Sequence, residues 1–413
     1  MMRLANLLDF VCILLWAGLS GNLFILASYV PVREYAGPNF FDAWTYWDNV
    51  DNTTWGNVTY VDRQTATSSR LAYVNDAGNA IIKVDNTTLI SPAPLVNRNS
   101  VRITSQDTYG VGNLIVIDVR HIPYGCSTWP SFWTLGTEIE WPNSGEIDII
   151  EGINMLTHNQ MALHTIGGCF QAANPGQTGQ TIEGDCSKPQ GCLVAETKPN
   201  SWGQAFAQAG GGVWALQLDV SGIYIWFWSR PDVPPGISSA TNTSTLDTTT
   251  WGMPSASYPA SGCNITQFFT PQQLVIDITL CGVWLLSQTN RAGVPSIYAS
   301  TCQTPTMSCV ADNIIGSGSP AYDNAFWEIS WIRAYTNNPA AAPPPPQTTS
   351  SLSTQAPALP TSTTTLFVTG SREPTSVIEP TQTPSAAQST NAFSSTTRLL
   401  SIPLCLAIGT LVF

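Results

Sequence analysis

The residues best suited to chemistry are three carboxylates in the segment Gly-Glu-Ile-Asp-Ile-Ile-Glu-Gly, residues 145–152. Glu146, Asp148 and Glu151 are separated by isoleucines, and a glycine closes the segment at each end. Isoleucine favours buried strands, whereas carboxylates avoid apolar surroundings unless the fold needs them there. This conflict predicts a β-strand that carries catalytic acids.

The spacing of the three acids predicts an irregular strand. Side chains alternate along a strand, so Glu146 and Asp148 share one face while the isoleucines between them point into the core. Strict alternation would turn Glu151 away from the other acids. One extra residue at Ile149 and Ile150, a β-bulge, returns Glu151 to their face, and bulges are common beside active sites. We therefore expect three carboxylates on one exposed face.

Three carboxylates this close together repel one another, so at least one should keep its proton to a higher pH than usual. A pair with one ionised and one protonated carboxyl is what retaining glycoside hydrolysis requires, the first as nucleophile and the second as general acid. A calcium site or a plain polar strand is the alternative. Calcium ligands come mostly from flexible loops, which an isoleucine-rich strand fits poorly.

The composition narrows the class of ligand. Of 413 residues only 10% are charged, and the formal net charge is −12. The chain has no basic surface to neutralise phosphates, so we expect no nucleic-acid partner. The 15 Trp and 12 Tyr suit a neutral, hydroxyl-rich polymer, because aromatic faces stack on sugar rings. Packing in a β-sandwich core is the other use for these aromatic residues.

Ten cysteines indicate an oxidising compartment. Two of them lie in apolar terminal segments, and the other eight, an even number, predict disulfides. Zinc is the alternative, but the chain has no Cys-x-x-Cys pair and only three histidines, so we expect neither a metal nor a cofactor. The sequence leaves the pairing open, with Cys186–Cys192 and Cys302–Cys309 as candidates among Cys126, Cys169, Cys186, Cys192, Cys263, Cys281, Cys302 and Cys309.

The N-terminal part of the chain also indicates export. Residues 1–27 are mostly apolar and predict a signal peptide, with an uncleaved signal anchor as the alternative. Sequons of the form Asn-x-Ser/Thr predict N-glycosylation. They lie at Asn52, Asn57, Asn86, Asn242 and Asn264.

The C-terminal part differs sharply in composition. Residues 337–398 are rich in Ser, Thr and Pro and predict a disordered stalk, either O-glycosylated or a plain linker. Residues 399–413 are apolar and uncharged. Small residues and a polar spacer precede them, which is typical of a GPI-anchor signal. We expect attachment at Ser385, with Ser389 or Asn391 as alternatives, and hence an extracellular protein held at the cell surface or cell wall.

Residues 28–336 carry strand patterns, with no internal repeat and no long amphipathic helix. Runs of β-branched and aromatic residues alternate with turn signals, which predicts an all-β sandwich or barrel. The expected strands are 79–84, 114–119, 146–150, 212–220, 223–229, 273–279 and 325–335.

The acidic strand and its surroundings resemble glycoside hydrolase family 16 in its bulged, laminarinase-like form, and in particular its fungal endo-1,3(4)-β-glucanases. The resemblance covers residues 28–336 and implies a catalytic domain with a concanavalin A-like β-jelly-roll sandwich and a concave substrate cleft. The segments that carry it are 39–42 (NFFD), 125–133 (GCSTWPSFW), 141–145 (WPNSG), 146–151 (EIDIIE), 151–154 (EGIN) and 281–282 (CG).

The resemblance also implies roles for the acids. Glu146 would be the nucleophile and Glu151 the general acid and then base, with Asp148 assisting by proton sharing. Relatives often carry an acidic residue and small residues after the Cys-Gly pair, whereas here Val283 begins a bulky apolar stretch. That difference leaves the substrate preference open.

Four further residues resemble cleft positions of the family. Three tryptophans would stack on glucose units and one histidine would lie near the cleaved bond, with core packing or a structural hydrogen bond as the alternatives. They are Trp129, Trp133, Trp141 and His164.

The resemblance implies an endo-acting retaining hydrolase of β-1,3- or mixed β-1,3/1,4-glucan, and we expect a monomer. A cell-wall glucan transglycosylase is an alternative on the same fold. A non-catalytic glucan-binding surface protein is a third possibility, which the intact Glu146 and Glu151 disfavour.

Overall fold

Strands dominate the part of the chain that the computed structural model describes, which is residues 28–283, 297–302, 306 and 308–338. The strands are β1 (Ser28–Ala36), β2 (Trp44–Tyr46), β3 (Asn49–Val50), β4 (Val58–Tyr60), β5 (Ala72–Val74), β6 (Ala80–Lys83), β7 (Arg98–Ser100), β8 (Arg102–Tyr109), β9 (Asn113–His121), β10 (Thr128–Gly136), β11 (Glu146–Glu151), β12 (Gln160–His164), β13 (Gln180–Thr181), β14 (Cys192–Ala195), β15 (Gly212–Asp219), β16 (Gly222–Ser229), β17 (Leu246–Asp247), β18 (Ala256–Pro259), β19 (Gln272–Leu280) and β20 (Phe326–Thr336).

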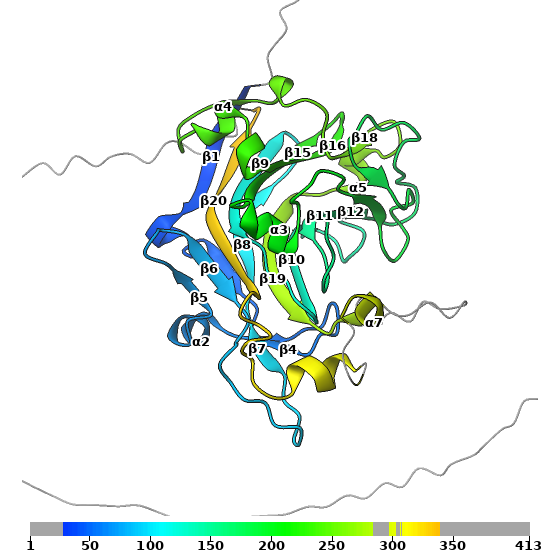
Figure 1. The fold of residues 1–413 in the computed structure, drawn as a ribbon. Coiled ribbons are helices and arrows are strands. Elements are labelled where there is room, and N and C mark those ends of the chain that lie inside the picture. Colours follow the sequence, from blue (N-terminus) through cyan, green and yellow to red (C-terminus); the bar gives the residue numbers. More distant parts are fainter. Residues whose placement is uncertain (1–27, 284–296, 303–305, 307, 339–413) are drawn as a thin grey trace, which may run out of the picture. The chain divides into compact units, whose positions relative to one another are not determined.

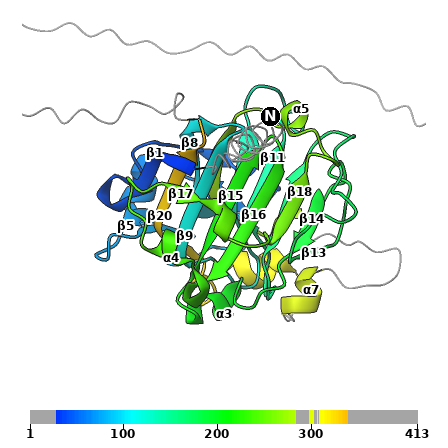
Figure 2. The same cartoon turned by 90° about the horizontal axis from the view of Figure 1, so that it is seen from above.

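Two large antiparallel sheets stack on each other (Figure 1). A nine-stranded sheet has the order β17-β1-β20-β9-β15-β16-β18, with β6 joining β20 to β5, and its strands lie side by side in Figure 2. An eight-stranded sheet has the order β13-β14-β12-β11-β10-β19-β8-β2, and β3, β4 and β7 form a small third sheet. The expected all-β sandwich is confirmed, and the acidic strand β11 lies inside the eight-stranded sheet.

The core between the two large sheets explains the strand patterns. On β9, Ile115 and Ile117 lie in the main hydrophobic core, whereas Leu114 and Val116 lie in a second cluster with Trp226 of β16. Strands that are buried on both faces read as continuous apolar runs rather than as alternating ones. Each of the seven expected strands matches an observed strand, with ends displaced by at most two residues.

Helices are short. Among the described residues the α-helices are α2 (Arg63–Ser68), α3 (Gly203–Gln208), α4 (Pro235–Ser238), α5 (Ile265–Phe268) and α7 (Ile297–Cys302). The same residues include the 3-10 turns η1 (Gly37–Asn39), η2 (Arg230–Asp232) and η3 (Thr248–Thr250) and the π-helical turn η4 (Val310–Ile314). Within the described residues, no helix is both long and apolar enough to cross a membrane.

Four disulfides tie the domain together. Cys186–Cys192 confirms one expected pair. The expected Cys302–Cys309 pair is wrong, because Cys302 pairs with Cys126 and Cys309 with Cys281. The fourth is Cys169–Cys263. Three of the four join segments at least 28 residues apart, and cross-links that close long loops remove the most freedom from the unfolded chain.

Several predictions fall on residues outside the described part of the chain. They are the signal peptide or anchor at 1–27, nearly all of the stalk, the apolar tail at 399–413, and the attachment site at Ser385 with its alternatives.

Candidate active site

The predicted bulge is present in β11. Against β12, Asp148 lies opposite Ala162 and Glu151 opposite Gln160, so three steps on β11 match two on β12. The register against β10 shifts between Ile150 and Asp148, which leaves Ile149 as the extra residue. The isoleucines of the strand lie in the main core. The bulge therefore lets all three acids line the opposite face.

The two glycines that enclose the acidic strand are required by close packing. Gly145 has φ +74°, and a Cβ there would lie 2.4 Å from the Phe269 ring. A Cβ on Gly152 would lie 2.6 Å from the Trp202 ring. Both distances are far below a van der Waals contact, so a larger residue at either end would displace the strand that carries the acids.

The acids lie in a cavity of about 1030 Å³, not on an exposed face as we expected. Asp148 is only 3% exposed, and Glu146 and Glu151 are half-buried. Tryptophan side chains flank the acids and reduce their contact with water, which the strand pattern alone did not predict. The cavity wall includes all four predicted cleft residues, Trp129, Trp133, Trp141 and His164.

Two of these tryptophans donate hydrogen bonds to the acids. Trp141 Nε1 donates to Glu146 Oε2 at 2.6 Å, and Trp129 Nε1 donates to Glu151 Oε1 at 2.7 Å. Ser131 Oγ also reaches Glu151 Oε1, at 3.3 Å. Trp129 is 8% exposed, whereas Trp141 is 55% exposed. Each indole thus holds one carboxylate in place, and the exposed Trp141 also lines the cavity.

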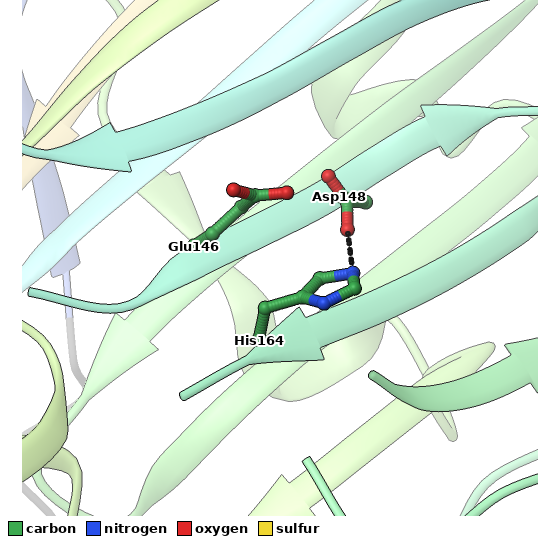
Figure 3. Close-up of side chains that lie close together, drawn as sticks. All are labelled: Glu146, Asp148 and His164. Atoms are coloured by element: carbon green, nitrogen blue, oxygen red, sulfur yellow. Dashed lines mark ion pairs between the residues drawn. The ribbon is translucent and has the colours of Figure 1, made fainter. Parts of the chain in front are cut away.

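Asp148 lies beside a histidine. His164 Nε2 is 3.3 Å from Asp148 Oδ2, and Figure 3 shows Glu146, Asp148 and His164 pointing toward one another. Each of the three offers one ligand atom within 4.8 Å of the others. The expectation that the chain needs no metal or cofactor stays a prediction.

Burial and mutual repulsion change the acidity of the cluster. Burial first, and then the charge of Asp148, raises the pKa of Glu146 to about 8 and that of Glu151 to about 8. Burial raises the pKa of Asp148 to about 7. Ionisation of one carboxyl opposes ionisation of the next, so the cluster passes through a state in which one acid is ionised and another still carries its proton.

Sequence reasoning missed a fourth acid in the cavity. Asp277 of β19 lies across from Ser131 and is 7% exposed, and Trp133 Nε1 donates to its Oδ2 at 3.1 Å. Burial raises the pKa of Asp277 to about 7. Arg102, whose guanidinium lies 5.1 Å from the Trp133 ring centre, opposes that rise. An acid within the apolar strand 273–279 was the available signal, the same one that identified β11.

The predicted glycosylation sites lie at or near the surface. Asn52, Asn242 and Asn264 are exposed, whereas Asn57 and Asn86 are half-buried. Asn86 Nδ2, the atom that a glycan would occupy, donates to Asp323 Oδ1 at 2.7 Å. Asn52 lines the cavity that holds the acids. Glycosylation of these residues stays a prediction.

The segment after the Cys-Gly pair borders the cavity. Val283 lines the cavity wall and is 51% exposed, and its N–H donates to the Thr54 carbonyl at 2.9 Å. An apolar side chain thus stands at this point of the cavity wall. The bulky residues that follow it lie outside the described part of the chain.

Comparison with known proteins identifies the family of this domain. Residues 44–335 match the model of the XgeA-like catalytic GH16 domain. A probable endo-1,3(4)-beta-glucanase of Aspergillus fumigatus is 36% identical over 318 residues, which cover 75% of this chain and 45% of that protein. The chain thus spans about half the length of such curated relatives.

Two solved structures resemble the fold. GH16 Laminarinase 16A from Phanerochaete chrysosporium, with β-glucans in its donor and acceptor sites, matches at 36% identity and a TM-score of 0.67. An elongating GH family 16 β-1,3-glucosyltransferase matches at 34% identity and a TM-score of 0.63. Each match covers 75% of this chain and 100% of the other. With a catalytic-domain match over residues 44–335 and this sandwich fold, the chain belongs to glycoside hydrolase family 16.

Proposed function

We propose that the chain is an endo-acting retaining hydrolase of β-1,3- or mixed β-1,3/1,4-glucan. The observation that carries this proposal is the bulge of β11, which brings Glu146, Asp148 and Glu151 to one face, inside a cavity lined by tryptophans. Aromatic rings with a few polar groups suit a neutral sugar polymer. Family relatives with endo-1,3(4)-beta-glucanase names support this choice of substrate.

In the first step, Glu146 acts as the nucleophile. A carboxylate oxygen of Glu146 attacks the anomeric carbon, and the glycosidic C–O bond breaks. Glu151 gives its proton to the departing oxygen, so the leaving sugar departs as a neutral alcohol. The product is a glycosyl ester on Glu146, and Glu151 is now ionised.

In the second step, Glu151 reverses its role. Its carboxylate takes a proton from water as the water oxygen attacks the anomeric carbon, and the ester bond to Glu146 breaks. Glu146 is again ionised and Glu151 again protonated. Two inversions at one carbon retain its configuration.

Asp148 links the two reacting acids electrostatically. Its charge raises the pKa of both Glu146 and Glu151. The acids therefore do not all ionise together, and one keeps its proton while another is ionised. The nearby His164 partly offsets this effect on both acids. Trp141, through its bond to Glu146, and Trp129, through its bond to Glu151, each favour the ionised form of the acid that they contact.

Transglycosylation is a second candidate activity. An elongating β-1,3-glucosyltransferase of the same family, at 34% identity, favours it. The first step would be the same, and a sugar hydroxyl would replace water in the second. Trp141, which is exposed and lines the cavity, would be the residue on which such an acceptor stacks.

Product analysis tests the proposed hydrolysis. Incubation with laminari-oligosaccharides of one length should give only shorter products, because water completes the second step. Chromatography of the early products measures this directly. Products longer than the starting sugar would instead establish transfer, and absence of any cleavage of laminarin, lichenan or barley glucan would contradict both activities.

We also propose that the protein acts outside the cell, held at its surface by a GPI anchor. Four disulfides and exposed sequons support an extracellular location. Treatment of intact cells with a phosphatidylinositol-specific phospholipase should release the protein into the medium, as measured by immunoblot. Protein that stays with the cells after treatment, while a known anchored protein is released, would rule out the anchor.

A further inference from the structure

The bulge that aims Glu151 leaves backbone groups of β11 without partners in the neighbouring strand. Between Asp148 and Glu151 the pairing with β12 is interrupted. Buried backbone groups that lose their ladder partners are costly unless another group replaces them. The donor at Glu151 and the acceptor at Ile149 both need such a replacement.

One side chain supplies both missing partners, the acceptor for Glu151 N and the donor for the Ile149 carbonyl. Asn159, directly before β12, accepts a hydrogen bond from Glu151 N at its Oδ1, 3.0 Å away. Its Nδ2 donates to the Ile149 carbonyl at 2.9 Å. A carboxamide is suited to this task, because it carries one acceptor and one donor on the same planar group. The amide thus takes the place of a strand across the bulge.

Asn159 is itself held in place. It is fully buried, with 0% exposure. Its backbone N–H donates to Ser201 Oγ at 3.1 Å, and its carbonyl accepts from Glu196 N at 2.9 Å. The bulge is therefore linked through Asn159 to the buried segment that contains Ser201.

We propose that Asn159 is a positioning residue for the general acid. It does not reach the substrate; it sets the backbone from which Glu151 projects, and Ser201 supports it from behind. This inference rests on the proposed function, in which Glu151 protonates the leaving group. Loss of the amide should therefore weaken general acid catalysis more than substrate binding, because small misplacements of a reacting group cost large factors in rate.

The test compares two substrates in Asn159→Ala and Asn159→Asp. Aspartate keeps an acceptor for Glu151 N but turns the donor to Ile149 into a second acceptor. For laminarin, kcat should fall by about tenfold to a hundredfold, with KM changed by less than about threefold. For dinitrophenyl β-laminaribioside, whose leaving group needs no proton, kcat/KM should fall by less than about threefold.

Asn113→Asp is the matched control. On β9, Asn113 also bridges two backbone groups with its amide, accepting from Gly110 N at 2.9 Å and donating to the Tyr335 carbonyl at 3.0 Å. It lies in the other sheet, so this variant should lose comparable thermal stability but keep the wild-type ratio between the two substrates. Ser201→Ala gives a milder form of the same test if the Asn159 variants do not fold.

Glu151→Gln measured alongside separates the two hypotheses. Suppose that Glu151→Gln keeps its activity on the dinitrophenyl substrate, whereas the Asn159 variants lose activity on both substrates equally or on neither. The positioning role is then wrong and the proposed function stands. Ser201→Ala is read in the same way where the Asn159 variants do not fold. If Glu151→Gln itself lowers both substrates equally, the acid role of Glu151 fails, and the positioning role fails with it. Selective loss in both Glu151→Gln and the Asn159 variants supports the inference.

Discussion

Glu146→Gln should lower the hydrolysis of laminarin by about a thousandfold or more, because no other group on the acidic strand takes the place of the nucleophile. The amide keeps the size of the side chain and can still contact Trp141, so the cavity should keep its shape. Binding of laminari-oligosaccharides should stay within about threefold of the native value, since the indole faces remain. Initial rates and calorimetric affinities measure the two quantities.

The matched control for this substitution is Glu138→Gln, which makes the same chemical change on an exposed residue just before the acidic strand. That variant should keep the native rate. A Glu146→Gln enzyme that retains more than a few per cent of the native rate would contradict the nucleophile assignment.

Glu151→Gln should have the second-largest effect, and the size of the effect should depend on the leaving group. Hydrolysis of laminarin should fall by about a hundredfold to ten-thousandfold, since general acid catalysis is lost. The kcat/KM of dinitrophenyl β-laminaribioside should change far less. Added azide should attack the glycosyl ester in place of base-activated water, raise the turnover of that substrate and give a β-glycosyl azide.

The pH dependence supplies an internal check on Glu151. A general acid works only while protonated, so native kcat/KM should fall as pH rises through the pKa of Glu151, which burial and the charge of Asp148 raise to about 8. The fall at high pH should disappear in Glu151→Gln. An unchanged high-pH limb, or an equal loss on both substrates without rescue by azide, would assign the acid role elsewhere.

Local periodicity was enough to predict the acidic strand and its bulge. The isoleucines favour the core and the acids favour the opposite face, so Glu146, Asp148 and Glu151 can share one face only if the strand has a bulge. The register of β11 shows that bulge. The strands of the core followed from the same kind of pattern. The likeness to family 16 was carried by short motifs at and near this strand, and the domain match confirmed it.

Features that depend on how distant segments meet could not be predicted. Cys302 lies seven residues from Cys309 in sequence, yet it pairs with Cys126, 176 residues away, because the fold brings that loop closer. Asp277 lies in the cavity because β19 pairs with β10, and this pairing of distant segments is not encoded in any local pattern. The burial of the acids also required the tryptophans from neighbouring elements.

The central claim is that a covalent glycosyl ester forms on Glu146, and trapping that ester tests it most directly. A 2-deoxy-2-fluoro laminaribiosyl fluoride should react once, because the fluoride leaves readily while the fluorine at C2 slows hydrolysis of the ester. After proteolysis, mass spectrometry should find the sugar on the peptide that contains residues 146–151, with fragment ions that assign it to Glu146. A label on any other residue, or cleavage of laminari-oligosaccharides to α-configured products without a label, would contradict the mechanism.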